Sequence, residues 1–142
     1  MDNNNLSFDH IHIISPDPDA AARWYEDVLG ARIASNHEVR GAAQINVRLA
    51  GMSLLIRGQR PGETPDLVSP MQQFSDYASH NNWGTDHFGY TYKGDLYAWC
   101  EELKTRGATF SVEPYEFNPG TVICYLAAPD GVSIEIVQAR DT

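Results

Sequence analysis

Residues 10–33 read HIHIISPDPDAAARWYEDVLGARI and residues 87–110 read HFGYTYKGDLYAWCEELKTRGATF, and these two stretches decide the fold. They align without a gap, so that His10 falls on His87, and each histidine directly follows an aspartate. In both stretches a short β-type run leads through a turn into an amphipathic helical pattern. The sequence therefore contains an internal repeat.

Each predicted helix has suitable residues at its ends. In the first copy Asp17 is the expected N-cap, Pro18 the first helical residue and Gly30 the left-handed cap. The second helix is expected to start near residues 94–95 and to end at Gly107. The apolar stripes of the two helices consist of Ala21, Trp24, Tyr25 and Val28, and of Leu96, Trp99, Cys100 and Leu103.

Three strand-like runs follow each helix, so each copy has the order β-α-β-β-β. The runs are residues 31–38, 43–49 and 52–57 in the first copy, and 108–113, 122–127 and 132–137 in the second. We therefore predict a single domain built from two tandem modules, about residues 6–58 and 84–138. A proline-rich linker over about residues 59–83 joins them, with a short helix expected over residues 70–77.

Composition excludes several classes of function. Lys and Arg total 10 against 19 Asp and Glu, and the resulting charge of −9 disfavours binding to nucleic acid or to an anionic membrane. No apolar run is long enough to span a bilayer, and the polar first ten residues predict no signal peptide. Two cysteines are too few for a disulfide scaffold or a cysteine zinc site. We expect a cytoplasmic protein that handles a small molecule.

The motifs FDHIHI, WYEDVLG and PDGVSIEI, in this order along the chain, resemble the vicinal oxygen chelate superfamily. This group includes glyoxalase I, extradiol dioxygenases, an epimerase, fosfomycin-resistance proteins and bleomycin-binding proteins. The resemblance implies an α+β fold in which two tandem βαβββ modules form a half-open mixed β-barrel with flanking helices. It also implies a small-molecule substrate and a homodimer, and in many members one metal ligand comes from the partner's module.

The family's metal positions fall on His10, His87 and Glu135. Two imidazoles and one carboxylate on one face of a divalent ion leave positions open for substrate, an arrangement that favours Fe(II), with Mn(II), Zn(II) and Ni(II) as alternatives. Glu135 lies in an otherwise apolar strand, where an unpaired charge would be costly. His12 shares a strand face with His10 and remains an alternative ligand or a substrate-facing residue. Gln44 is a further candidate oxygen donor.

The first module departs from the four-ligand members of the family, because Leu55 occupies the position that matches Glu135. Leucine cannot bind a metal, which argues for three protein ligands and against an authentic glyoxalase I. Residues 61–92 and 107–139 contain no lysine or arginine. A phosphate or phosphonate needs dense cationic contacts, so such a substrate is disfavoured.

Residues 125–135 are similar to the extradiol dioxygenase signature, in which a tyrosine and a Pro–Gly pair precede the ligand glutamate. The resemblance gives Tyr125 the role of hydrogen-bonding a substrate oxygen, and a buried core aromatic is the alternative interpretation. Two features depart from the signature: Cys124 replaces an aliphatic residue, and the upstream histidine is absent. The acid/base histidine of a ring-cleaving site would be His80 or His12.

The leading hypothesis is a metal-dependent enzyme, with an Fe(II) extradiol-type dioxygenase favoured over a glyoxalase-like lyase or isomerase. A metal-free protein that binds a drug or metabolite is the alternative from another class, and a structural metal domain is the third. Aromatic side chains could line an apolar pocket, namely Phe74, Tyr77, Trp83, Tyr90, Tyr92, Tyr115, Phe117 and Tyr125.

Overall fold

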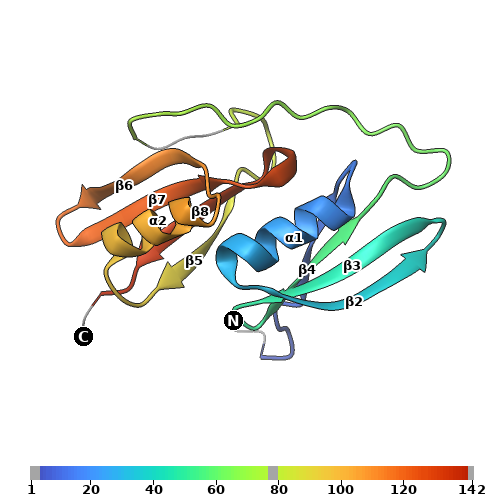
Figure 1. Ribbon diagram of the computed structural model, residues 1–142, viewed down its shortest axis with the longest axis horizontal. Coiled ribbons are helices and arrows are strands. Elements are labelled where there is room, and N and C mark those ends of the chain that lie inside the picture. The colour runs from blue at the N-terminus through green and yellow to red at the C-terminus, as the bar shows by residue number, and fades with distance from the viewer. Residues whose placement is uncertain (1–3, 77–79, 141–142) are drawn as a thin grey trace. The chain divides into compact units, whose positions relative to one another are not determined.

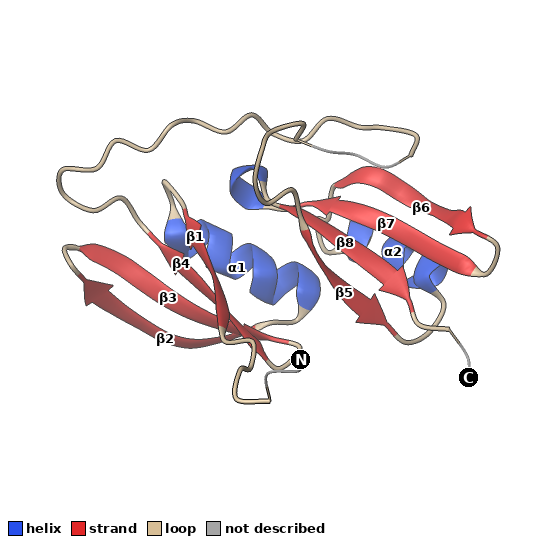
Figure 2. Ribbon diagram, turned by 180° about the vertical axis from the view of Figure 1, so that it is seen from behind, coloured by secondary structure: helices blue, strands red, loops and turns tan. Residues whose placement is uncertain are grey.

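The structure is a computed structural model that describes residues 4–76 and 80–140 (Figure 1). It divides the chain into two compact units, Met1–Asp66 (unit 1) and Leu67–Thr142 (unit 2). Each unit holds a four-stranded mixed sheet with an α-helix over one face, seen from the opposite side in Figure 2. The predicted α+β fold of two tandem βαβββ modules is confirmed. No helix of the described residues is long and apolar enough to cross a membrane.

Unit 1 follows the predicted order of elements. These are β1 (His10–Ile14), α1 (Pro18–Leu29), β2 (Arg32–Val39), β3 (Ala42–Leu49) and β4 (Met52–Arg57). The sheet order is β1-β4-β3-β2, with β1 parallel to β4 and the other pairs antiparallel. The Asp17 carboxylate accepts a hydrogen bond from the Ala20 N–H, and Gly30 ends the helix at φ +71°. Both predicted caps are confirmed.

Unit 2 repeats this order. Its elements are β5 (Phe88–Tyr92), α2 (Leu96–Thr105), β6 (Phe110–Asn118), β7 (Thr121–Ala127), a 3-10 turn (Pro129–Gly131) and β8 (Ser133–Gln138), in the sheet order β5-β8-β7-β6. Asp95 is the N-cap of α2, and Arg106 is its C-cap, one residue before the predicted Gly107. β6 runs to Asn118, past the predicted end at residue 113. Pro114 is tolerated there because it lies at an irregularity in an edge strand.

Each helix packs on its own sheet through a fully buried stripe. The buried sets are Ala21, Ala22, Tyr25 and Val28 against Ile45, Val47, Leu54 and Ile56, and Leu96, Cys100 and Leu103 against Cys124, Leu126, Ile134 and Ile136. The two predicted stripe tryptophans are only half-buried. Trp99 instead stacks on Tyr92, with ring centroids 4.2 Å apart. In unit 2 the face away from α2 also buries apolar side chains, namely Val112, Ile123 and Tyr125.

The predicted linker helix is wrong for residues 70–76, and its last residue, Tyr77, lies outside the described residues. Phe74 pairs in parallel with Val112 of β6, and the Phe74 N–H donates to the Ser111 carbonyl at 2.7 Å. β6 is an edge strand with free backbone groups, so an extended segment can satisfy them where a helix could not.

The two cysteines lie in the core of unit 2 as free thiols. Cys100 and Cys124 are 0% exposed and their Sγ atoms are 3.6 Å apart. The hydrogen bond shared with Cys100, together with burial, raises the pKa of the Cys124 thiol. Because both thiols are shielded from solvent, we expect the native protein to resist the thiol reagent DTNB, whereas the denatured chain reacts at both cysteines. Rapid labelling of either thiol in the native protein would contradict this packing.

Candidate metal centre

The strongest candidate site lies at the start of β5, where the ring of His87 is held between two carboxylates. Its Nδ1 lies 2.7 Å from Oδ2 of Asp86, and its Nε2 lies 3.3 Å from Oε2 of Glu135. The three side chains are similarly shielded, with exposed fractions of 21–23%. Both ring nitrogens of one histidine therefore face carboxylate oxygens in a partly buried place.

This donor set fits a divalent metal. When Nδ1–H of His87 donates to Asp86, Nε2 presents a lone pair to the carboxylate of Glu135. Two such electron-rich atoms repel each other unless a proton or a cation lies between them. Two ligand atoms on one ion, each about 2.0–2.2 Å from it and about 90–110° apart, are separated by about 3.0–3.4 Å. The observed 3.3 Å agrees with this, and a carboxylate on the far nitrogen is the usual partner of a metal-binding histidine.

The strand pairing explains why Glu135 faces this site. In β8 it alternates with Ile134 and Ile136, which are 0% and 1% exposed on the helix side. Its partner on β5 is Gly89, where an added Cβ would lie only 3.0 Å from the Glu135 carbonyl oxygen. Its partner on β7 is Tyr125. Glu135 therefore faces away from α2, and a glycine provides space beside it.

Tyr125 joins this site to the core of unit 2. Its ring meets that of His87 edge-to-face, with centroids 5.1 Å apart. It is 2% exposed and packs with Val112 and Ile123. The two interpretations made from the sequence are thus compatible, since Tyr125 is a core aromatic that also lies against the candidate ligand.

Unit 1 repeats the aspartate–histidine pair. Nδ1 of His10 lies 2.6 Å from Oδ2 of Asp9, but here the side chains are 39% and 89% exposed. On the neighbouring strand, Leu55 pairs with His12. This pair corresponds to the pair of Glu135 with Gly89 in unit 2. His10 therefore has the carboxylate partner typical of a metal-binding histidine, and unit 1 lacks the carboxylate ligand on β4.

His12 has a different environment from His10. Burial is the main cause that lowers the pKa of His12, and the positive charges of Arg57 and Arg60 lower it further. Among the described residues, no carboxylate contacts its ring. The described residues contain no cluster of three or more His, Cys, Asp or Glu arranged to hold a metal ion. The structure brings together His87 and Glu135 in unit 2, and His10 as third ligand remains a prediction.

The linker supplies a pocket in unit 2. Its volume is about 240 Å³, and its lining residues are Ser69, Pro70, Met71, Gln72, Phe74 and His80. Met71 packs against the core that contains Tyr125. The His80 N–H donates to Oδ1 of Asp86 at 3.0 Å, so one carboxylate holds both the linker and the ring of His87. The acid/base role of His80 stays a prediction.

Most of the aromatic residues predicted to line a pocket lie elsewhere. Trp83 and Phe117 are exposed, whereas Tyr90 and Tyr92 lie on the helix side of β5. Burial raises the pKa of Tyr90 to about 12. Phe74 lines the linker pocket, and Tyr115 packs against the core beside Tyr125. Successive side chains of a strand point to opposite faces of the sheet, so these aromatic residues do not gather in one place. Composition alone does not predict this.

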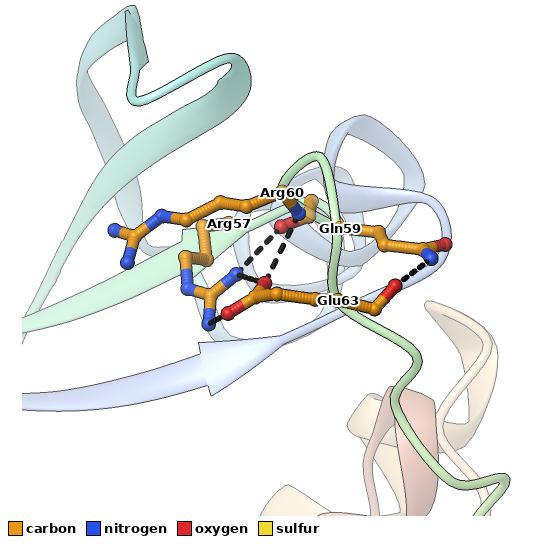
Figure 3. Close-up of polar contacts among 5 residues, drawn as sticks. Arg57, Gln59, Arg60 and Glu63 are labelled. Carbon is orange, nitrogen blue, oxygen red and sulfur yellow. Dashed lines mark hydrogen bonds and ion pairs between the residues drawn. The ribbon is translucent and has the colours of Figure 1, made fainter.

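Sequence reasoning missed the ion pair between Arg57 and Glu63 and the double role of Asp86. Figure 3 shows the first, in which Glu63 turns back toward the end of β4. Nothing in the spacing of Arg57 and Glu63 distinguishes them from ordinary surface charges. The role of Asp86 had a visible signal, because an aspartate precedes the histidine in both copies of the repeat.

Three comparisons relate the chain to known proteins. Residues 7–136 match the model of the Glyoxalase/Bleomycin resistance protein/Dioxygenase superfamily. The lactoylglutathione lyase of Haemophilus influenzae is 27% identical over 138 residues, which cover 89% of this chain and 87% of that protein. A protein of Synechocystis named "Probable lactoylglutathione lyase" is 36% identical over 67 residues, and the match spans 41% of this chain and 51% of that relative.

Solved structures agree on the fold. A glyoxalase family protein from Bacillus cereus superposes with a TM-score of 0.73 at 16% identity, covering 98% of this chain and 97% of that one.

Proposed function

The chain belongs to the Glyoxalase/Bleomycin resistance protein/Dioxygenase superfamily, and from this premise we propose that it is a metal-dependent enzyme that binds neighbouring oxygens of a small substrate. The observation that carries the proposal is the His87 ring, fixed by Asp86 with its Nε2 3.3 Å from the carboxylate of Glu135. A chain that only sequesters a ligand has no need for this arrangement.

The proposed ligands are His87 and Glu135 of unit 2 together with His10, from unit 1 of the same chain or of a second chain in a homodimer. When bound, a divalent metal polarises substrate oxygens as a Lewis acid. The two-histidine, one-carboxylate set favours Fe(II), with Mn(II), Zn(II) and Ni(II) as alternatives. Asp86 orients His87, and Tyr125, whose ring packs against that of His87, is the proposed group that positions a substrate oxygen. His80 and His12 are the proposed acid/base groups.

Two reaction classes compete within this proposal. Relatives named lactoylglutathione lyase favour a glyoxalase-like lyase or isomerase, which is our first candidate. The three-ligand set, with Leu55 in place of a fourth ligand, distinguishes the proposed site from a four-ligand glyoxalase I. The second candidate is an extradiol-type dioxygenase, favoured by Tyr125 lying directly opposite Glu135 and against His87.

Metal analysis of protein purified without oxygen tests the proposal. We expect a stoichiometric divalent metal in the parent chain and its loss in His87→Ala and Glu135→Ala. A parent chain with no metal would support a metal-free binding protein instead. The metal-loaded protein is then assayed for lactoylglutathione formation from glutathione and methylglyoxal, and for oxygen uptake with a panel of catechols. The first activity supports the lyase and the second the dioxygenase.

Tyr125→Phe tests the proposed positioning of substrate. The substitution removes one hydroxyl and keeps the ring that packs on Val112. We expect metal content to be unchanged and kcat to fall by about tenfold, since only a hydrogen bond to the reacting oxygen is lost. Tyr115→Phe is the matched control, because Tyr115 packs against the same core. Equal effects of the two substitutions would assign Tyr125 a purely structural role.

A further inference from the structure

Unit 1 holds a buried arginine whose charge is neutralised from within the chain. The side chain of Arg57 is 8% exposed, and its guanidinium meets the Glu63 carboxylate through two parallel contacts (Figure 3). Nη1 donates to Oε1 at 2.7 Å and Nη2 to Oε2 at 3.2 Å. Nη1 also donates to the carbonyl of Gly58 at 3.0 Å, which fixes the plane of the guanidinium. A bidentate fork of this kind matches the geometry of a planar carboxylate.

A third donor also contacts that carboxylate. We call the guanidinium of Arg57 and the backbone N–H of Arg60 together the cradle. The backbone N–H of Arg60 donates to Oε1 of Glu63 at 3.1 Å. The hydrogen bond from Arg57 is the main cause that lowers the pKa of Glu63. The carboxylate is thus bound as a ligand would be, by two guanidinium N–H groups and one amide.

Arg57 and the Glu63 carboxylate that it binds differ in burial and in the part of the chain to which they belong. Arg57 belongs to β4, where it pairs with Ile14 and Gln44 on the sheet face opposite α1. Glu63 lies beyond the sheet in a turn closed by its own N–H to the Arg60 carbonyl, and its side chain is 38% exposed. The cradle is therefore anchored in the sheet, while the occupant can leave by rotation of an exposed side chain.

The two arginines contact Glu63 through different groups. Arg57 donates through its guanidinium, whereas Arg60 donates through its backbone N–H and its own guanidinium points away from the carboxylate (Figure 3). The Nε atoms of both arginines are buried without a hydrogen-bond partner in this described part. A buried donor without a partner is costly, so the arrangement has unused capacity for an acceptor.

We propose that the guanidinium of Arg57 and the backbone N–H of Arg60 form a binding site for the carboxylate of a small molecule, and that Glu63 is an internal occupant that the ligand displaces. This site lies within unit 1 and needs no metal, so its test is independent of the proposed enzymatic activity.

The experiment measures binding of succinate by calorimetry, against sodium chloride at equal ionic strength. In the parent chain Glu63 competes at high effective concentration, so we expect weak saturable binding, and in Glu63→Ala binding tighter by about tenfold or more. Arg57→Gln in either background should abolish it. Glu38→Ala, which removes an exposed glutamate of the same unit, should bind like the parent.

The other outcomes are equally decisive. Equal affinities of parent and Glu63→Ala, or binding that survives Arg57→Gln, would overturn the site. Saturable binding to Glu63→Ala alone, with none to the parent up to about 100 mM, would make Glu63 a permanent structural partner and overturn displacement. Tighter binding of inorganic phosphate than of succinate would overturn the carboxylate assignment. If Glu63→Ala does not fold, succinate but not chloride should restore its circular dichroism, and failure to do so counts against the site.

Discussion

Replacing Glu135 with glutamine is expected to lower the affinity of the protein for its divalent metal by a factor of about a thousand. Losing a residue that merely orients a ligand typically costs about 10- to 100-fold, and Glu135 is proposed to be a ligand itself. The glutamine keeps the shape but offers a neutral amide oxygen, while removing the one negative charge of the proposed set. Competition between the apo-protein and a chelator for Zn(II) or Mn(II) measures the effect.

The matched control for this substitution is Glu113→Gln. Glu113 carries the same charge in the same unit but is exposed on β6, where it pairs with Lys104 at 2.7 Å. Its replacement should leave metal affinity unchanged. In the metal-free protein Glu135→Gln should not lower the melting temperature, because the substitution relieves the repulsion between two acceptors at 3.3 Å. Unchanged metal affinity in Glu135→Gln would refute the assignment of Glu135 as a ligand.

The repeat made the fold predictable, because local signals and the global pattern agreed. Asp17 and Gly30 cap α1 as expected, and the predicted last strand of the first module, residues 52–57, has the bounds of β4. The errors arose where long-range pairing overrode local preference. β6 continues past Pro114 because its partner strand continues, and Phe74 runs extended because β6 has a free edge.

The candidate site was predictable only in part, for a related reason. Alternation in a strand shows that Glu135 faces away from the helix, but it does not show what the side chain meets there. Contact between Glu135 and His87 depends on the register of β5 on β8, which the sequence does not specify. The ion pair of Arg57 with Glu63 depends on the course of a turn, which no periodicity describes.

The strand register also accounts for the difference between the modules. A carboxylate on β8 is accommodated because its neighbour on β5 is Gly89. The corresponding neighbour on β1 is His12, and the residue opposite it is Leu55. In unit 2 the glutamate is paired with a glycine, and in unit 1 the leucine that replaces the glutamate is paired with a histidine. The asymmetry between the two copies is therefore a paired change on neighbouring strands.

Asp86→Asn is expected to lower metal affinity by about 10- to 100-fold while leaving every proposed ligand in place. Asp86 uses both oxygens as acceptors, Oδ2 for the His87 ring and Oδ1 for the His80 N–H. An asparagine has only one acceptor atom and must turn its NH₂ toward one of these donors. If the NH₂ meets Nδ1, the ring proton shifts to Nε2, which blocks coordination; if it meets His80, the linker contact is lost.

The control for Asp86→Asn is the same substitution in the other copy of the repeat. Asp9 makes an equivalent contact with His10 at 2.6 Å, but it is 89% exposed, so water can replace it. We expect a loss of metal affinity at least several-fold smaller for Asp9→Asn. Equal losses would show that burial of Asp86 adds nothing to its orienting effect. No loss in either variant would mean that the paired aspartates do not support metal binding, and the internal repeat would then reflect the fold alone.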